Sequence, residues 1–340
     1  MIENKFNWPL WHWHFEVTSS CTLKCPRCSR TELPDLLTID KLGLDFFQEN
    51  FDEEIVSEID RISFCGYDGD PIYNKEFIEI CDYFKNIKPE IEIYIVTNGS
   101  YKKPEWWERL CGVLNKHDQI HLSIDGYDQK SNEKYRVNSS WQSISDAITV
   151  ISGKDVRLVW DIIYFDFNYS HIDYIKSMAK RRGFDAMRIT KSNKFFSCGA
   201  EYDKSLEPPD EFMSSTGRFE TETIYFTDRK IYNDSLKNAL QRYKNIDKSK
   251  SIIPLCMIGT KGLFVDSQGY FYPCCWIINK YDRENYKKWL VPEKNIKLSG
   301  LVPVLNSPVW KSFIDSIPTN TICNLKCKAT ETTENTVIRW

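Results

Sequence analysis

Apolar, strand-like runs alternate with amphipathic, helix-like stretches through the first 190 residues of this 340-residue chain. We predict strands at His12–Thr18, Arg61–Cys65, Ile91–Thr97, Gln119–Ser123, Val156–Tyr164 and Ala186–Thr190. We predict helices near Ile39–Ser57, Lys75–Asn86, Glu105–Leu114, Trp141–Ile151 and Ile172–Arg182. Strands separated by helices pair in parallel, so this order predicts an α/β fold with a closed or partly open (β/α)6 TIM-like barrel. Chemistry in such barrels lies at the C-terminal strand ends.

Composition and charge indicate a globular protein outside the membrane. Hydrophobic residues make up 41% and charged residues 27%, with a formal net charge of −3 that does not favour a nucleic-acid partner. The chain starts without a cationic segment followed by an apolar run, and no run is long enough to span a bilayer. We therefore expect a cytoplasmic protein. Its 12 cysteines are then expected to be metal ligands or small buried residues and not a disulfide framework.

The chain divides into three parts by composition. Residues 1–194 carry the barrel pattern, and residues 195–251 form a bridging segment with an acidic and then a basic run. A charged run is usually a solvated face, and within it we predict one helix near Ser235–Ile246. Residues 252–340 hold a second set of cysteines and are predicted to form a small α+β domain.

Three cysteines at C-x3-C-x2-C spacing follow the first predicted strand directly, at Cys21, Cys25 and Cys28. Three such thiolates can hold three irons of a [4Fe–4S] cluster, which leaves the fourth iron open to a small molecule. An alternative without metal is that the three cysteines are ordinary core residues. A zinc site is another, but structural zinc requires a fourth ligand, which would have to come from far away in the sequence.

The triplet resembles the cluster loop of the radical S-adenosylmethionine (radical SAM) superfamily, and further motifs continue the resemblance at successive strand ends. These motifs are Gly66-Tyr-Asp-Gly-Asp-Pro71, Thr97-Asn-Gly99, Ser123-Ile-Asp-Gly126 and Tyr135-Arg136. Each motif alone is weak, but their order at strand ends is specific. Two departures stand out. Arg27 occupies a position that is usually aromatic, and Gly66–Pro71 is two residues longer than the family's Gly-Gly-Glu-Pro, with Asp for Glu.

The resemblance implies a partial (β/α)6 TIM-like barrel, and it also implies the roles of these residues. The three cysteines would hold a [4Fe–4S] cluster whose open iron binds SAM, and reductive cleavage of SAM would give a 5′-deoxyadenosyl radical that abstracts hydrogen from a substrate. Backbone carbonyls near Gly69 would accept from the methionine ammonium, and Arg136 suits a carboxylate. The resemblance thus implies that SAM is bound by Gly69, Asp70, Pro71, Asn98, Ser123 and Arg136.

A second set of cysteines lies near the C-terminus, as Cys256-x12-Gly269-x4-Cys274 and Cys323-x3-Cys327. A hairpin is predicted around Gly269, with strands at Lys261–Asp266 and Tyr270–Pro273. Four thiolates can close a second cluster or bind zinc. The pattern resembles the SPASM extension, and more closely its short form, Twitch, which implies one auxiliary [4Fe–4S] cluster. Cys275 could replace Cys274, although the spacing from Gly269 favours Cys274.

The resemblance implies oxidative modification, by dehydrogenation or crosslinking, of a small molecule or peptide. Only 20 residues precede Cys21, so we expect no leader-peptide domain. A flavodoxin- or ferredoxin-like reductant is expected, and Asp125 and Asp161 are candidate catalytic residues near strand ends. Two alternatives stay open: a non-catalytic iron–sulfur or zinc protein, and a nucleic-acid modifying radical SAM enzyme. His12, His14 and Glu16 share one face of the first strand, which we interpret as a polar strand face.

Overall fold

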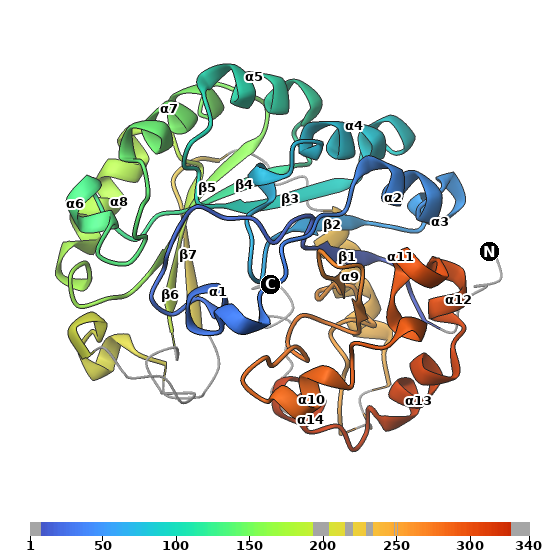
Figure 1. The fold of residues 1–340 in the computed structure, drawn as a ribbon. Coiled ribbons are helices and arrows are strands. Elements are labelled where there is room, and N and C mark those ends of the chain that lie inside the picture. The colour runs from blue at the N-terminus through green and yellow to red at the C-terminus, as the bar shows by residue number, and fades with distance from the viewer. Residues whose placement is uncertain are drawn as a thin grey trace.

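A curved nine-stranded sheet forms the centre of the computed structural model, with strand order β7-β6-β5-β4-β3-β2-β1-β8-β9 (Figure 1). The structure describes residues 8–192, 204–214, 220–228, 234–247, 249 and 251–327. The strands are β1 (His12–Phe15), β2 (Arg61–Phe64), β3 (Glu92–Thr97), β4 (Gln119–Ser123), β5 (Arg157–Ile163), β6 (Ala186–Lys191), β7 (Glu220–Tyr225), β8 (Leu263–Val265) and β9 (Phe271–Tyr272).

Helices follow most of these strands. Those of the first half are α1 (Ser29–Glu32), α2 (Leu44–Asn50), α3 (Glu53–Ser57), α4 (Phe77–Ile87), α5 (Pro104–Val113), α6 (Gln129–Asn132), α7 (Trp141–Ile151) and α8 (Ile172–Arg181). Those of the second half are α9 (Asp234–Asn245), α10 (Arg283–Lys287), α11 (Ile296–Ser299), α12 (Leu301–Leu305), α13 (Pro308–Ser316) and α14 (Thr321–Lys326).

Strands β1 to β6 pair in parallel in sequence order, which confirms the predicted α/β class and the six predicted strands. The sheet does not close on itself within the described residues, because β7 and β9 form its two edges. The barrel is therefore partial, as predicted. Figure 1 shows α2, α4, α5, α7 and α8 along its outer, convex side.

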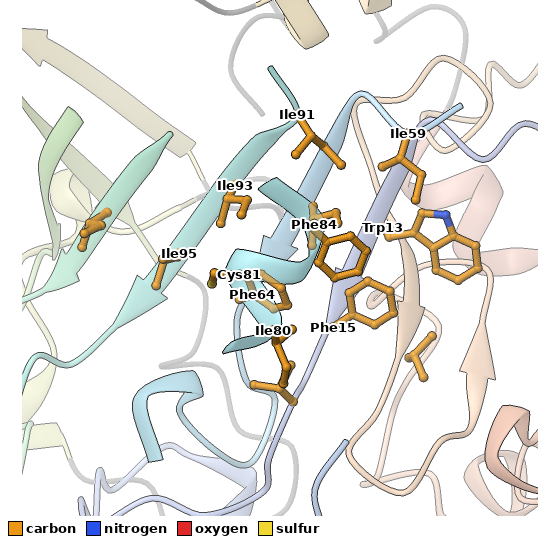
Figure 2. Packing of buried hydrophobic residues seen from close by; sticks show 14 of the residues in the cluster. Trp13, Phe15, Ile59, Phe64, Ile80, Cys81, Phe84, Ile91, Ile93 and Ile95 are labelled. Carbon is orange, nitrogen blue, oxygen red and sulfur yellow. The ribbon is translucent and has the colours of Figure 1, made fainter. Parts of the chain in front are cut away.

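The main hydrophobic core lies between the sheet and this outer helical layer. On β1, Trp13 and Phe15 point outward and are fully buried, and Phe84 from α4 packs on the same layer (Figure 2). Phe15 meets Phe47 and Phe51 edge-to-face, with ring centroids 5.1 and 5.2 Å apart. Full burial of each such side chain contributes about 1.5–3 kcal/mol to stability. This packing holds the strands against the helices, so it also holds the strand ends in place.

The inner face of the sheet carries polar side chains that pair with one another. His12 Nε2 lies 2.8 Å from Ser63 Oγ, and Arg61 bonds Glu92 at 2.8 Å. Because side chains alternate across a strand, the neighbours of Trp13 and Phe15 along β1 point inward. The polar face predicted for the first strand is thus present and lines the barrel interior, where His12 and Glu16 are buried and His14 is partly buried.

Two local predictions need correction. The helix predicted at Ile39–Ser57 is broken into α2 and α3, because Asp52 caps α3 by accepting from the Ile55 N–H. The charged bridging segment contains a strand, β7, which pairs antiparallel with β6. Its charged side chains suit an edge strand, where charge discourages further pairing. The helix predicted near Ser235–Ile246 is confirmed as α9.

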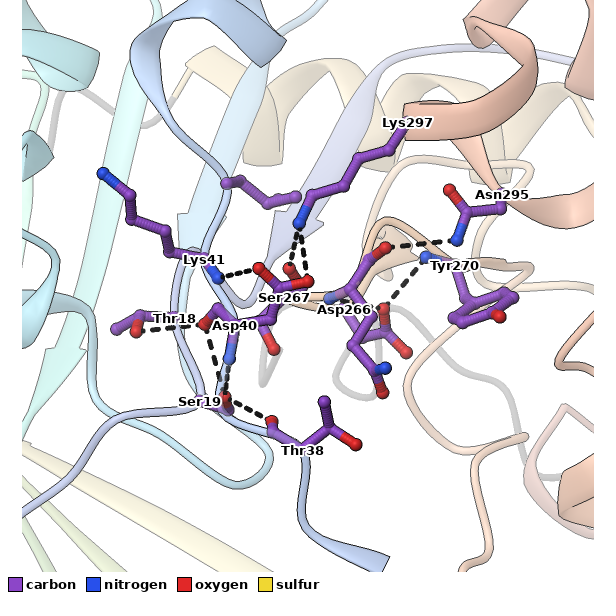
Figure 3. Close-up of polar contacts among 12 residues, drawn as sticks. Thr18, Ser19, Thr38, Asp40, Lys41, Asp266, Ser267, Tyr270, Asn295 and Lys297 are labelled. Atoms are coloured by element: carbon purple, nitrogen blue, oxygen red, sulfur yellow. Dashed lines mark hydrogen bonds and ion pairs between the residues drawn. The ribbon is translucent and has the colours of Figure 1, made fainter. Parts of the chain in front are cut away.

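The C-terminal residues join the same sheet. The predicted hairpin is confirmed, since β8 and β9 pair antiparallel around Gly269, whose φ is +89°. Strand β8 also pairs in parallel with β1. Lys297 Nζ binds both Asp40 Oδ2 and the Ser267 carbonyl at 2.9 Å, which ties this region to the segment after β1 (Figure 3). The predicted domain boundaries stay a prediction.

In the parts of the chain that the structure describes, no helix combines the length and the apolarity needed to cross a membrane.

Candidate cluster and cofactor site

The loop between β1 and α1 places the three N-terminal cysteines together beside a cavity of about 190 Å³. Cys21 Sγ accepts from the Leu23 N–H at 3.4 Å and from Asn98 Nδ2 at 3.7 Å. Burial and then the nearby Asp70 carboxyl raise the pKa of the Cys21 thiol to about 12. Such N–H donors aimed at a sulfur suit a thiolate that ligates iron, where they compensate its charge. The donor set therefore fits a cluster bound by three cysteines.

The same cavity gathers residues from the ends of four strands. Its lining includes Gly69, Asp70, Asn98, Ser123 and Arg136. Five of the six residues predicted to bind SAM therefore share one cavity with the three cysteines. Pro71 lies outside that lining, at the start of the short 3-10 helix Pro71–Tyr73. Binding of SAM by these residues stays a prediction.

Close packing explains the two glycines of the loop after β2. A Cβ atom on Gly66 would lie 1.8 Å from the carbonyl oxygen of Gly69, and one on Gly69 would lie 1.9 Å from that of Thr18. The Asp70 N–H also donates to the Ser20 carbonyl at 3.0 Å. The loop thus lies directly against the cluster loop, and no larger residue fits at either glycine.

Asp70 ties this loop to the end of β3. Its carboxylate accepts from Thr97 Oγ1 and from the Asn98 N–H, both at 2.7 Å, and from Asn98 Nδ2 at 2.5 Å. Burial raises its pKa to about 6, although these donors lower it. Asp70 can therefore fill the position of the family's Glu as a brace between two motifs that both reach the cavity.

Arg136 is held at the cavity by Asp125. Arg136 Nε donates to Asp125 Oδ2 at 2.6 Å, and Asp125 Oδ1 accepts from the Ile163 N–H at 2.9 Å. Burial lowers the pKa of Arg136, but Asp125 and Cys25 raise it by more. Asp125 has no exposed surface and both its oxygens are engaged. This geometry suits a residue that orients Arg136, and its catalytic assignment stays a prediction.

Asp161, the other candidate catalytic residue, belongs to a polar group inside the barrel. Arg188 donates to its two oxygens at 2.9 and 2.5 Å, and His121 Nδ1 lies 3.0 Å from Oδ1. Tyr94 Oη accepts from Arg188 at 2.8 Å. Burial would raise the pKa of Asp161, but Arg188 and His121 together lower it. A carboxylate with a lowered pKa is a weak proton acceptor, so this site favours orientation of Arg188.

The C-terminal cysteines surround a cavity of their own, whose lining includes Cys256, Cys274, Cys323 and Cys327. Burial raises the pKa of the Cys256 thiol, and the other three cysteines raise it further. Cys275 does not line this cavity, and its thiol interacts with Lys261 instead. The four thiols that line the cavity are those of the predicted auxiliary set.

Within the described ranges, no three His, Cys, Asp or Glu side chains come close enough to hold one metal ion. The cysteines instead line the two cavities as separate sets.

Sequence reasoning missed Glu16 as a residue of this site. Glu16 is buried and its Oε1 accepts from the N–H groups of Tyr67, Asp68 and Gly69. One signal was present: an acidic residue at an inward position of a strand that precedes the cluster loop. Cys65, which the sequence predicts only as a buried residue, and Tyr135, which it places in a motif, also line the cavity.

Residues 15–179 match the family model described as the radical SAM superfamily. That range contains the three-cysteine loop and every strand-end motif described above. The fold and the site define an α/β partial barrel with a cluster loop at its C-terminal strand ends. Residues 15–179 of the chain are therefore a radical SAM domain.

Solved structures show the same fold over nearly the whole chain. The chain is similar to Streptococcus suis SuiB bound to S-adenosylmethionine, with TM-score 0.54 and 12% identity over 93% of this chain and 77% of that one. It is also similar to anSMEcpe with bound AdoMet, with TM-score 0.55 and 14% identity over 93% and 85% of the two chains. Comparison with curated proteins gave no match.

Proposed function

We propose that this chain is a radical SAM enzyme with a second, auxiliary [4Fe–4S] cluster, which oxidatively modifies a small molecule or a peptide. The observation that carries the proposal is the separate cavity lined by Cys256, Cys274, Cys323 and Cys327, in a chain whose match to the radical SAM family ends at residue 179. Four protein ligands leave no open iron, so such a cluster suits electron transfer better than substrate binding.

Cys21, Cys25 and Cys28 would hold a [4Fe–4S] cluster, which together with SAM would supply a 5′-deoxyadenosyl radical. The chain's own residues then bind and orient. Arg136, fixed by Asp125, offers a guanidinium to a carboxylate, and Asp70 holds the loops on either side of the cavity.

Oxidation of a substrate radical requires an acceptor for one electron and one for a proton. The auxiliary cysteines provide a site for the electron acceptor in this proposal. A fold neighbour, anSMEcpe, was solved with AdoMet and the Cp18Cys peptide, which supports a peptide among the candidate substrates. A flavodoxin- or ferredoxin-like reductant and a cytoplasmic location belong to the same proposal.

The test uses protein reconstituted with iron and sulfide under anaerobic conditions, reduced with dithionite and supplied with SAM. We expect about eight irons per chain, about four in the Cys21→Ala variant and about four in the Cys323→Ala variant. We expect 5′-deoxyadenosine from the wild type and from Cys323→Ala, and none from Cys21→Ala. Zinc at the C-terminal set, or no 5′-deoxyadenosine from the wild type, would refute the corresponding half of the proposal.

A further inference from the structure

The loop after β2 lines the cavity, and its backbone is bound by the side chain of Glu16, which lies outside the cysteine and glycine motifs. Glu16 Oε1 accepts from three consecutive backbone N–H groups, those of Tyr67 and Asp68 at 2.6 Å and that of Gly69 at 3.0 Å. Glu16 is only 3% exposed. Successive amides that converge on one oxygen form an anion-binding concavity, so the carboxylate fixes the backbone of the loop.

A second side chain holds the same loop from the C-terminal region. The Asp68 carboxylate pairs with Lys280 Nζ and accepts from Ser29 Oγ at 2.7 Å. Asp68 and Lys280 are both buried, and the ammonium also lies 5.5 and 5.4 Å from the ring centroids of Tyr67 and Tyr286. A buried ion pair needs such supporting contacts to offset its desolvation. Lys280 thus links the loop to a segment outside the radical SAM domain.

The residues next to Lys280 contact the segment that follows the three-cysteine loop. Tyr281 Oη donates to Glu32 at the end of α1, and Arg283 pairs with Asp35 at 2.5 Å. The Arg283 pair is exposed and contributes little by itself. The segment from 280 to 283 therefore contacts the loop after β2 and, through Glu32, the helix that follows the three-cysteine loop. Glu32 in turn pairs with Arg27 of the three-cysteine loop, so the positions of these segments depend on one another.

We propose that Glu16 and Lys280 are positioning residues for SAM, and that the C-terminal region is therefore part of the SAM site. The inference rests on the proposed function, because it assumes that the Gly66–Pro71 loop offers its carbonyls to the SAM ammonium. Removal of Glu16 takes away the acceptor that three N–H groups share, and removal of Lys280 takes away the cation that compensates the buried Asp68 carboxylate. Either change allows the loop to relax. SAM then binds more weakly, although its own contacts remain in the chain.

The first experiment compares Lys280→Met with Lys85→Met. Lys85 is a matched control, because its ammonium also binds a buried aspartate, Asp118, at 2.9 Å, but at the N-terminal end of β4. The SAM dissociation constant is measured from the change that SAM causes in the EPR spectrum of the reduced cluster, with iron counted per chain. We expect Lys280→Met to bind SAM at least tenfold more weakly with its iron retained, and Lys85→Met to stay within twofold.

The second experiment compares two variants of Glu16. Glu16→Leu removes the acceptor for three N–H groups, whereas Glu16→Gln keeps an oxygen there and should lose much less affinity. In uncoupled formation of 5′-deoxyadenosine, the KM for SAM should rise in Glu16→Leu while kcat at saturating SAM changes little. A merely structural defect would lower kcat and iron content together.

Equal SAM affinities in Lys280→Met and Lys85→Met would overturn this inference, and that comparison decides even if Glu16→Leu does not fold. A wild type that neither binds SAM nor forms 5′-deoxyadenosine would overturn the proposed function itself, and the inference with it.

Discussion

Substitution of Asp125 by asparagine tests whether this residue orients Arg136 or takes a proton. Asp125 has no exposed surface, and its ion pair with Arg136 spans 2.6 Å. Two unit charges about 4 Å apart attract by about 4 kcal/mol at an effective dielectric constant near 20. Loss of one partner of a buried pair costs about 3–5 kcal/mol. Arg136 keeps some contact with solvent, so we expect a loss near the lower value, about 3 kcal/mol.

Asparagine retains one oxygen, which can still accept from the Ile163 N–H, but it offers Arg136 no negative charge. We therefore expect Asp125→Asn to lower the free energy of unfolding by about 3 kcal/mol and to weaken SAM binding at least tenfold, or about 1.4 kcal/mol. Denaturant unfolding and the SAM-induced change in the EPR spectrum measure the two effects. Asp173→Asn is the control, because its pair with Lys176 is exposed and its loss should cost under about 0.5 kcal/mol.

Unchanged SAM affinity together with a lower kcat would refute the orienting role and favour Asp125 as a proton acceptor. An unchanged free energy of unfolding would refute the electrostatic argument, since it would mean that the ion pair between Asp125 and Arg136 does not stabilise the fold.

Four further results are expected. Gly69→Ala should abolish SAM binding with the iron retained, because its Cβ would lie 1.9 Å from a backbone oxygen; normal binding in a titration would contradict the packing. Cys274→Ala should lose about four irons and Cys275→Ala none, by iron analysis. Lys261→Met should lower the midpoint potential of the auxiliary cluster in an EPR redox titration, because it removes a cation near Cys274 and Cys275; an unchanged potential would exclude this. Burial and Asp68 raise the pKa of Glu16 from 4.5 to about 7, so between these pH values the folded state binds more protons than the unfolded chain, and the free energy of unfolding falls as pH rises. Denaturant unfolding at pH 4.5 and at pH 7 should show a fall of up to about 3 kcal/mol from this group. Glu16→Gln should lack this contribution.

The parallel strands could be predicted from the sequence because each carries its own apolar signal. The six predicted strands match β1 to β6 to within three residues at each end. The gathering of the motifs at one site could be predicted in the same way, because the C-terminal ends of parallel strands lie at the same edge of the sheet. The break after Asn50 was missed because a single capping aspartate, Asp52, decides it, and the amphipathic pattern continues on both sides.

Contacts between distant segments could not be predicted. Nothing local in the segment from Tyr67 to Gly69 indicates that a carboxylate from the end of β1 lies beneath it, and Lys280 lies in a segment with no cysteine or glycine motif. Strand β7 was missed for a similar reason, because its pairing with β6 comes from tertiary packing that overrides a charged local sequence. The two extra residues of the Gly66–Pro71 motif are Tyr67 and Asp68, and the structure explains them because their N–H groups donate to Glu16.

The register of the sheet also relates the two cysteine sets. Phe15 on β1 pairs with Val265 on β8, and Cys21 follows the end of β1 by six residues. Cys274 follows β9, the partner of β8, by only two residues. Cys21 and Cys274, one from each set, are therefore placed by strands of one hydrogen-bonded sheet. In the proposed function, transfer of an electron from a substrate radical to an auxiliary cluster would require a fixed separation between the two cysteine sets. Changes that disturb the β1–β8 pairing should therefore affect both sets together.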